Sequence, residues 1–217
     1  MRLIQLTIII GFLFFSSSLI GANHPYETIW SNLVSEHTLT KQSKKVAFVY
    51  VNYEAIAKSQ NFSLLLRILS GMDTQSLSKS QRLAYLINFY NIRMIESVSL
   101  KKPLENAFLD EIKMSIRELD ERALFGLSGN NIYLPNLNAY LSDSFEDQLS
   151  NQVESSVQKL FRYDRSVNIL YLNQWFDQQD FSLSFKQFLV SLMNPTFNYD
   201  TIDYHFSDFG VISNEIK

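Results

Sequence analysis

Residues 78–98 constrain the fold more than any other segment, because they predict one long helix that is apolar around most of its circumference. Ser78 and Gln81 fit the S-x-x-Q pattern of a capping box, in which each side chain satisfies a free backbone amide of the other residue. Apolar residues then recur at helical spacing, with others beside them. The main apolar face carries Leu83, Ile87, Tyr90, Met94 and Val98. We therefore expect this helix to lie buried at the centre of the domain.

The first 22 residues have the layout of a secretory signal peptide. Arg2 gives a short positive region, residues 3–15 are mostly apolar, and small residues stand at Gly21 and Ala22. We expect cleavage after Ala22, with Ser18 as the alternative, which leaves a mature domain of residues 23–217. The apolar run is too short to span a bilayer alone, which disfavours an uncleaved membrane anchor. The protein is predicted to be exported, either to the periplasm or out of the cell.

The composition excludes several classes of function. The chain has 19 Lys and Arg against 22 Asp and Glu, and loss of Arg2 with the signal peptide takes the net charge from −3 to −4. A mildly acidic chain is a poor candidate for binding nucleic acid. There is no cysteine, and histidine occurs only at His24, His37 and His205, so neither disulfides nor a metal-ligand cluster is expected. We predict no metal and no cofactor.

The remaining segments predict a helix-rich α+β domain with one small sheet. Beside the central helix, apolar periodicity and capping residues indicate helices over 25–39, 61–69, 115–123, 144–161 and 183–192. Residues rich in Val, Ile, Phe and Tyr predict strands, and we expect the sheet to be formed by segments near 46–53, 166–172 and 202–212.

Several short motifs, taken in order along the chain, resemble one family of bacteria and plants, domain of unknown function 547. Residues 84–91 read A-Y-L-I-N-F-Y-N and are similar to its A-F-W-I-N-x-Y-N helix. Residues 114–121 resemble its L-S-L-D-D-I-E-H segment, and residues 134–137 read L-P-N-L where the family has C-P-P-L. The resemblance covers nearly the whole mature chain and implies a papain-like or transglutaminase-like fold. The matching positions are Asn88, Tyr90, Asn91, Asp120, Leu134, Pro135 and Asp208.

The family's cysteine and histidine are presumed catalytic, and this chain has neither of them at the matching positions. Leu134 stands at the cysteine and Glu121 at the histidine of I-E-H. A second family histidine, in a stretch ahead of the cysteine, falls on Leu124 in an ungapped register and is deleted in the other. Thiol chemistry needs a thiolate and a base that polarises it. The resemblance therefore implies a pseudoenzyme without catalytic residues, acting as a binding or structural module in the cell envelope. Its partner would be an unidentified peptide, protein or envelope component.

The alternative is a hydrolase or transferase whose catalytic residues have moved. Ser128 or Asp208 combined with His205 would be such a site, and it requires these side chains to converge within hydrogen-bond reach. The pattern G-x-S-x-G is not completed around Ser128, and Ser-Gly pairs mostly mark turns.

Two asparagines interrupt the apolar central helix. Asn88 and Asn91 would be costly to bury without hydrogen bonds, so we expect them to be satisfied by neighbours and to hold the fold. The surroundings of Leu134 separate the remaining hypotheses. A cleft filled by Leu134 and Leu124 would indicate a scaffold, whereas an open groove would indicate binding.

Overall fold

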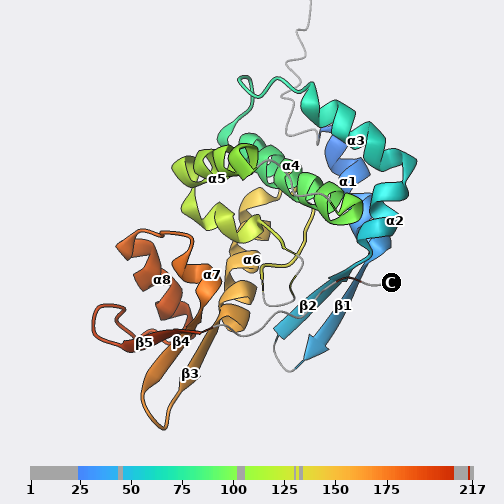
Figure 1. Cartoon of the computed structure of the whole chain (residues 1–217). Helices are drawn as coiled ribbons and strands as arrows, with labels where there is room; N and C mark the ends of the chain where they lie inside the picture. Colours follow the sequence, from blue (N-terminus) through green and yellow to red (C-terminus); the bar gives the residue numbers. More distant parts are fainter. Residues whose placement is uncertain are drawn as a thin grey trace, which may run out of the picture.

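The computed structural model describes residues 24–43, 46–101, 106–129, 131, 134–207 and 215, and its fold is α+β with helices dominant (Figure 1). The first elements are α1 (Pro25–His37), β1 (Thr38–Ser43), β2 (Val46–Val51), α2 (Tyr53–Lys58) and α3 (Gln60–Ser70). The central elements are α4 (Lys79–Leu100), α5 (Asn106–Leu119), the 3-10 helix η1 (Glu121–Gly126) and α6 (Phe145–Leu160). The last are β3 (Phe161–Asp164), β4 (Ile169–Asn173), α7 (Gln174–Asp177), α8 (Leu183–Met193) and β5 (Asp203–Ser207).

Helix α4 lies between two apolar cores, which confirms the predicted central helix. Leu83 and Ile87 face a core shared with α5, α6 and α8, whereas Ile92 and Ile95 face a core shared with α1, α3 and β2. The predicted capping box is present. The backbone N–H of Gln81 donates to Ser78 Oγ at 3.3 Å, and the backbone N–H of Ser78 donates to Gln81 Oε1 at 2.9 Å. A helix with a core on each side has little solvent-facing surface, which explains its apolar circumference.

The strands form two sheets, so the expectation of one sheet is wrong. β2 pairs antiparallel with β1, a neighbour in sequence, and these two strands make a sheet of their own. β4 pairs antiparallel with β3 and parallel with β5 in the other sheet. Because β1 is almost entirely exposed and polar, its sequence carries no strand periodicity, and pairing with β2 alone makes it a strand. The part of the predicted segment 202–212 beyond Ser207 lies outside the described residues.

The predicted helix ends were right where a terminal residue and the apolar periodicity point to the same position. α1 begins at Pro25, α6 follows Ser144, and α8 ends at Met193 with Asn194 as its cap. Two predicted starts are wrong. α3 is capped by Ser59 instead of Asn61, and Ser115 lies inside α5 because that helix begins its apolar stripe a turn and a half earlier, at Leu109 and Ile112.

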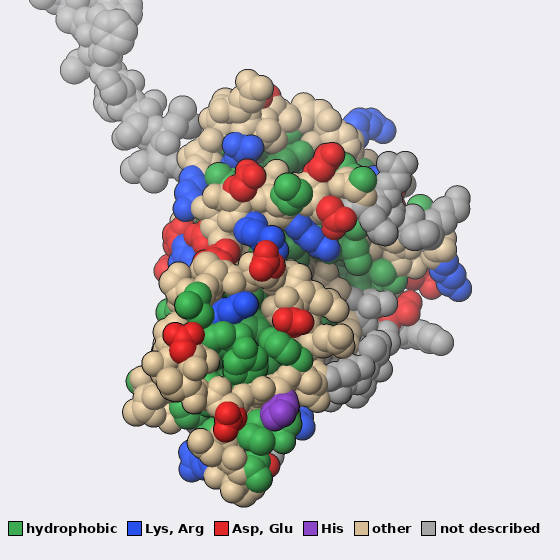
Figure 2. Space-filling model, turned by 60° about the vertical axis from the view of Figure 1, so that its left-hand side comes forward, with side chains coloured by type: hydrophobic (Ala, Val, Ile, Leu, Met, Phe, Trp, Pro, Cys, Tyr) green, Lys and Arg blue, Asp and Glu red, His purple; other side chains and the backbone are tan. Residues whose placement is uncertain are grey.

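One face of the molecule shows basic and acidic side chains intermingled, with hydrophobic side chains gathered lower down, where α7, α8 and the three-stranded sheet lie (Figure 2). Exposed apolar residues on these elements are Leu183, Phe188, Leu192, Tyr204 and Phe206. In the described part of the chain, no helix is both long and apolar enough to cross a membrane. The predicted signal peptide, residues 1–22, lies outside that part, and export stays a prediction.

Candidate functional site

Asn88 fixes one end of a long connection between η1 and α6. Its Oδ1 accepts hydrogen bonds from Trp30 Nε1 at 3.0 Å and from the Tyr140 amide at 2.9 Å, and its Nδ2 donates to the Tyr140 carbonyl at 2.7 Å. All three residues are buried. These bonds satisfy a primary amide that would otherwise be costly in an apolar core.

Asn91, one turn further along α4, fixes the other end of the same connection. Its Nδ2 donates to the Gly126 carbonyl at 2.9 Å. Its Oδ1 accepts from the Ser128 amide at 2.9 Å and from Ser128 Oγ at 3.2 Å. The two asparagines of the family-like motif therefore hold both ends of what we call the Leu134 segment, the described residues 127–129, 131 and 134–140.

Lys159 holds the middle of the Leu134 segment from the side of α6. Its Nζ donates to the Leu134 carbonyl at 2.6 Å and to Asn136 Oδ1 at 2.8 Å. Asn136 is bonded in turn to β2, through the Val49 amide and the Ala47 carbonyl. Burial lowers the pKa of Lys159 to about 7, because a charged ammonium is poorly solvated there. A neutral amine still has two N–H groups, enough for both acceptors.

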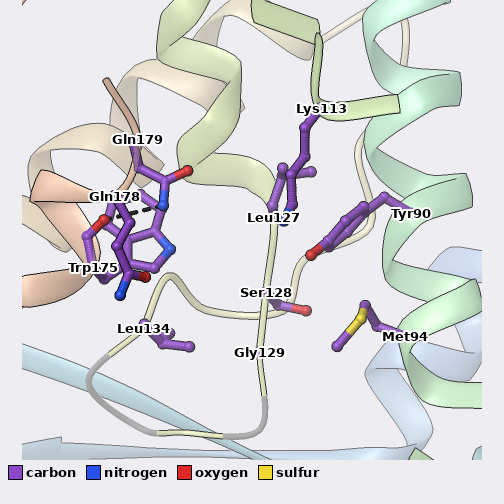
Figure 3. A pocket seen from close by; sticks show the side chains of 10 residues that line it. All are labelled: Tyr90, Met94, Lys113, Leu127, Ser128, Gly129, Leu134, Trp175, Gln178 and Gln179. Carbon is purple, nitrogen blue, oxygen red and sulfur yellow. Dashed lines mark hydrogen bonds between the residues drawn. The ribbon is translucent and has the colours of Figure 1, made fainter. Parts of the chain in front are cut away.

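A pocket of about 230 Å³ is enclosed by α4, α5, the Leu134 segment and the chain around α7 (Figure 3). Leu134, the residue at the family's cysteine position, is only partly buried and lines this pocket, while Pro135 beside it is buried. Leu124, the other candidate filler, packs into the core instead. The other lining residues are Tyr90, Met94, Lys113, Leu127, Ser128, Gly129, Trp175, Gln178 and Gln179.

Tyr90 points its hydroxyl into the pocket (Figure 3). Its side chain is 7% exposed, and within the described residues its hydroxyl has no hydrogen-bond partner. Lys113 Nζ approaches the same ring, 5.8 Å from its centroid. Burial, assisted by the Asp110 carboxylate, raises the pKa of Tyr90 to about 12. The hydroxyl therefore keeps its proton at neutral pH and is a hydrogen-bond donor.

The groups proposed for relocated catalysis are distributed differently. Ser128 reaches the pocket, but its hydroxyl donates to an amide oxygen of Asn91, which is no general base. His205 lies on β5 with its ring stacked on Tyr171 at 6.2 Å, and it is not among the residues that line the pocket. Asp208 lies outside the described residues. Among those residues, no group of three or more His, Cys, Asp or Glu side chains could hold a metal ion.

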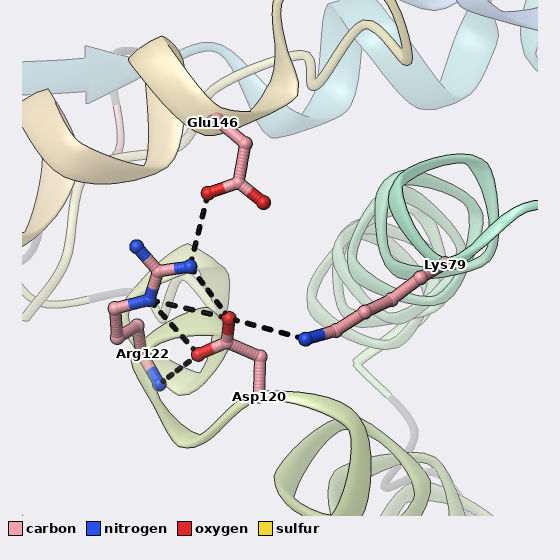
Figure 4. A network of polar contacts seen from close by, with 4 residues as sticks. All are labelled: Lys79, Asp120, Arg122 and Glu146. Carbon is pink, nitrogen blue, oxygen red and sulfur yellow. Dashed lines mark hydrogen bonds and ion pairs between the residues drawn. The ribbon is translucent and has the colours of Figure 1, made fainter.

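Asp120 belongs to a separate ionic network (Figure 4). Its side chain is 9% exposed and accepts hydrogen bonds from Arg122 Nε at 3.0 Å and Arg122 Nη2 at 2.7 Å, while Lys79 Nζ lies 3.8 Å away. Arg122 also bonds to Glu146 of α6 at 2.9 Å. Burial alone would raise the pKa of Asp120, but the guanidinium of Arg122 holds it below its usual range. Asp120 thus ties η1 to α4 and α6 and does not line the pocket.

Sequence reasoning missed Lys113, Gln178, Gln179 and Lys159 in this region. The first three join the pocket only because α5 and the chain after α7 border it, and nothing in their local sequence marks them. Lys159 did leave a signal. Gln152, Ser156 and Lys159 follow one another at helical spacing and are all buried, a polar stripe beside the apolar face of α6.

Comparison with known proteins found no relative: no protein-family model, curated protein or solved structure matches the chain significantly. The resemblance to the domain of unknown function 547 family rests on the sequence motifs alone.

Proposed function

We propose that this chain is an exported binding protein, a relative of the domain of unknown function 547 family that has kept a pocket and lost the thiol chemistry. The observation that carries the proposal is the position of Leu134, which lines an open pocket instead of filling it. An open groove at this residue favours binding over a purely structural role. The motif residues Tyr90 and Leu134 meet there, as expected of an inherited site.

The polar groups of the pocket suit binding better than covalent catalysis. Ser128 gives its hydroxyl proton to an amide oxygen, and Tyr90 stays protonated at neutral pH. Neither is activated as a nucleophile or a base. Both are held in place, Ser128 by Asn91 and Tyr90 by burial in α4, and preorganised groups lower the entropic cost of binding. If the predicted signal peptide exports the chain, the ligand is a small molecule or peptide of the cell envelope.

The proposal is tested by ligand-observed NMR on residues 23–217 with a set of fluorinated fragments of amino-acid size. Leu134→Trp should fill the pocket and abolish the binding of fragments that the wild type retains. Leu64→Trp, at an exposed leucine of α3, is the matched control and should leave binding unchanged. If no fragment distinguishes the wild type from Leu134→Trp, the binding proposal is wrong.

The enzymatic alternative is tested on the same samples. Hydrolysis of p-nitrophenyl acetate by the wild type should be no faster than by Ser128→Ala. Turnover that Ser128→Ala abolishes would support a hydrolase with relocated residues and overturn the pseudoenzyme proposal.

A further inference from the structure

We propose that the pocket selects a carboxylate, with the Lys113 ammonium and the Tyr90 hydroxyl as its donors. This inference rests on the proposed function, because it names the ligand class of the same pocket. Lys113 projects from α5 and Tyr90 from α4 toward one side of the cavity (Figure 3). The ammonium lies 5.8 Å from the Tyr90 ring centroid, and a carboxylate has two oxygens with which to accept from both donors.

The charge balance of the pocket favours an anion. Lys113 is the only side chain with a full charge at neutral pH among the described residues that line it. Its neighbour Asp110 lies 3.7 Å away, but that carboxylate is 65% exposed and does not line the pocket. An exposed ion pair of this kind contributes roughly 0–1 kcal/mol. Asp110 therefore does not prevent Lys113 from meeting a second carboxylate inside the cavity.

The Tyr90 hydroxyl is available as a donor to a ligand at this point. It faces the pocket, and the described residues offer it no acceptor. The hydroxyl is protonated, because the pKa of Tyr90 is raised to about 12. A carboxylate only accepts hydrogen bonds and would satisfy both Tyr90 and Lys113, whereas a neutral amide would place its own N–H beside one of them.

The rest of the pocket limits what can carry the carboxylate. Its 230 Å³ is below the range of about 300–1,000 Å³ that is usual for drug-sized ligands, so the body of the ligand is of amino-acid size. Met94, Leu134 and Trp175 offer apolar surface for that body. Ser128 Oγ donates to Asn91 and keeps lone pairs for an N–H group of the ligand. A small organic acid and the C-terminal residue of a peptide both have this chemistry.

Four probes test the inference by isothermal titration of residues 23–217. N-acetylglycine and its amide differ only in the terminal group, a carboxylate in one and a neutral amide in the other. Trialanine and its C-terminal amide repeat the comparison on a peptide end. We expect each acid to bind at least about tenfold more tightly than its amide, because hydrogen bonds to charged groups contribute about 1.5–3 kcal/mol. A preference for trialanine would identify a peptide end, and a preference for N-acetylglycine a free acid, and either supports the carboxylate.

Two variants connect the preference to the named donors. Lys113→Gln should reduce the affinity for the acids about tenfold and leave the amides unchanged, and Tyr90→Phe should reduce it about fivefold. Lys186→Gln is the matched control, because Lys186 also lies 5.8 Å from a tyrosine ring, that of Tyr199, and is not among the lining residues of this pocket. It should change no affinity more than about twofold.

Each failure has a distinct meaning. If acids and amides bind equally, or if Lys113→Gln changes nothing, the carboxylate inference is wrong while the binding function stands. Binding of none of the four probes also overturns the carboxylate inference. The fluorinated fragments then decide separately whether the pocket binds anything.

Discussion

Asn88 and Asn91 are the same residue type, three positions apart on one helix, and both bind the backbone of the Leu134 segment, yet they work in different surroundings. Asn88 is enclosed by Trp30 and Tyr140 and has only protein around it. Asn91 holds Ser128, which forms part of a pocket wall. The comparison teaches that one motif can contribute a closed structural contact and the support of a binding site at the same time.

Removing the buried contact of Asn88 should destabilise the fold more than removing that of Asn91. Asn88→Ala leaves the Trp30 indole N–H and both backbone groups of Tyr140 without partners in a dry core, so we expect the free energy of unfolding to fall by about 4 kcal/mol. Urea denaturation measures it. Asn151→Ala, at an exposed asparagine of α6, should cost less than about 0.5 kcal/mol. If Asn88→Ala lowers the free energy of unfolding by less than about 1 kcal/mol, the difference proposed between the two asparagines is wrong.

Asn91→Ala should lower the free energy of unfolding by less, about 2 kcal/mol, although it also removes three hydrogen bonds. The reason is the neighbouring pocket, because solvent that enters it can replace part of what the Ser128 amide and hydroxyl lose. The same variant should weaken ligand binding, since it frees one wall of the pocket. If the two alanine variants destabilise the fold equally, solvent in the pocket does not compensate for the loss of Asn91.

The pH dependence of stability tests the third anchor, Lys159. An unfolded lysine keeps its proton up to about pH 10.4, whereas folded Lys159 loses it near a pKa of about 7. Between these values the unfolded state binds more protons, so the free energy of unfolding rises with pH. We expect a rise of roughly 3 kcal/mol from pH 6 to 9 in the wild type.

Lys159→Met should flatten this rise. The exposed Lys58→Met should keep it, which makes Lys58 the matched control. The test ends below pH 10, where buried tyrosines such as Tyr90 have the opposite effect. If the free energy of unfolding depends on pH in the same way in the wild type and in Lys159→Met, Lys159 does not cause the rise.

The smallest effect is expected at Asp120, which stabilises the start of η1 without touching the pocket. Asp120→Asn should cost about 1 kcal/mol at pH 7, because it removes the ion pairs with Arg122 and Lys79. The folded pKa of Asp120 is lowered, so this contribution is present above the unfolded pKa near 3.9 and lost as pH falls below it. The two proteins should therefore approach equal stability as the pH falls through the folded pKa of Asp120.

Two measurements sharpen that prediction. The exposed Asp177→Asn is the control and should change the stability little at either pH. Ligand affinity should be the same in Asp120→Asn and the wild type. A loss of binding would mean that the Asp120 network supports the pocket after all.

The sequence predicted the parts of the fold that depend on neighbours along the chain. The capping box at Ser78, the proline that opens α1 and the apolar stripe of α6 are local signals, and each prediction was right. Strand β1 was not predicted, because its residues are polar and exposed. Its partner β2 provides the hydrogen bonds that its own sequence does not indicate.

The candidate site divides in the same way. Motif reasoning singled out Asn88, Tyr90, Asn91 and Leu134, and the structure gathers them around one connection. It also grouped Asp120 with them, which belongs instead to an ionic network elsewhere. Lys113 and Gln179 could not have been predicted, because they enter the pocket only through the packing of α5 and of the chain after α7.

The sequence by itself determined that thiol chemistry is absent, that the central helix is apolar around most of its circumference, and that two of its asparagines need hydrogen bonds. Only the tertiary structure decided what those asparagines hold, that a pocket lies beside Leu134, and that the Tyr90 hydroxyl faces it without a partner among the described residues. Periodicity and capping act over one or two helical turns, so a sequence displays them directly. A pocket is the space left where distant segments pack, and no single segment encodes it.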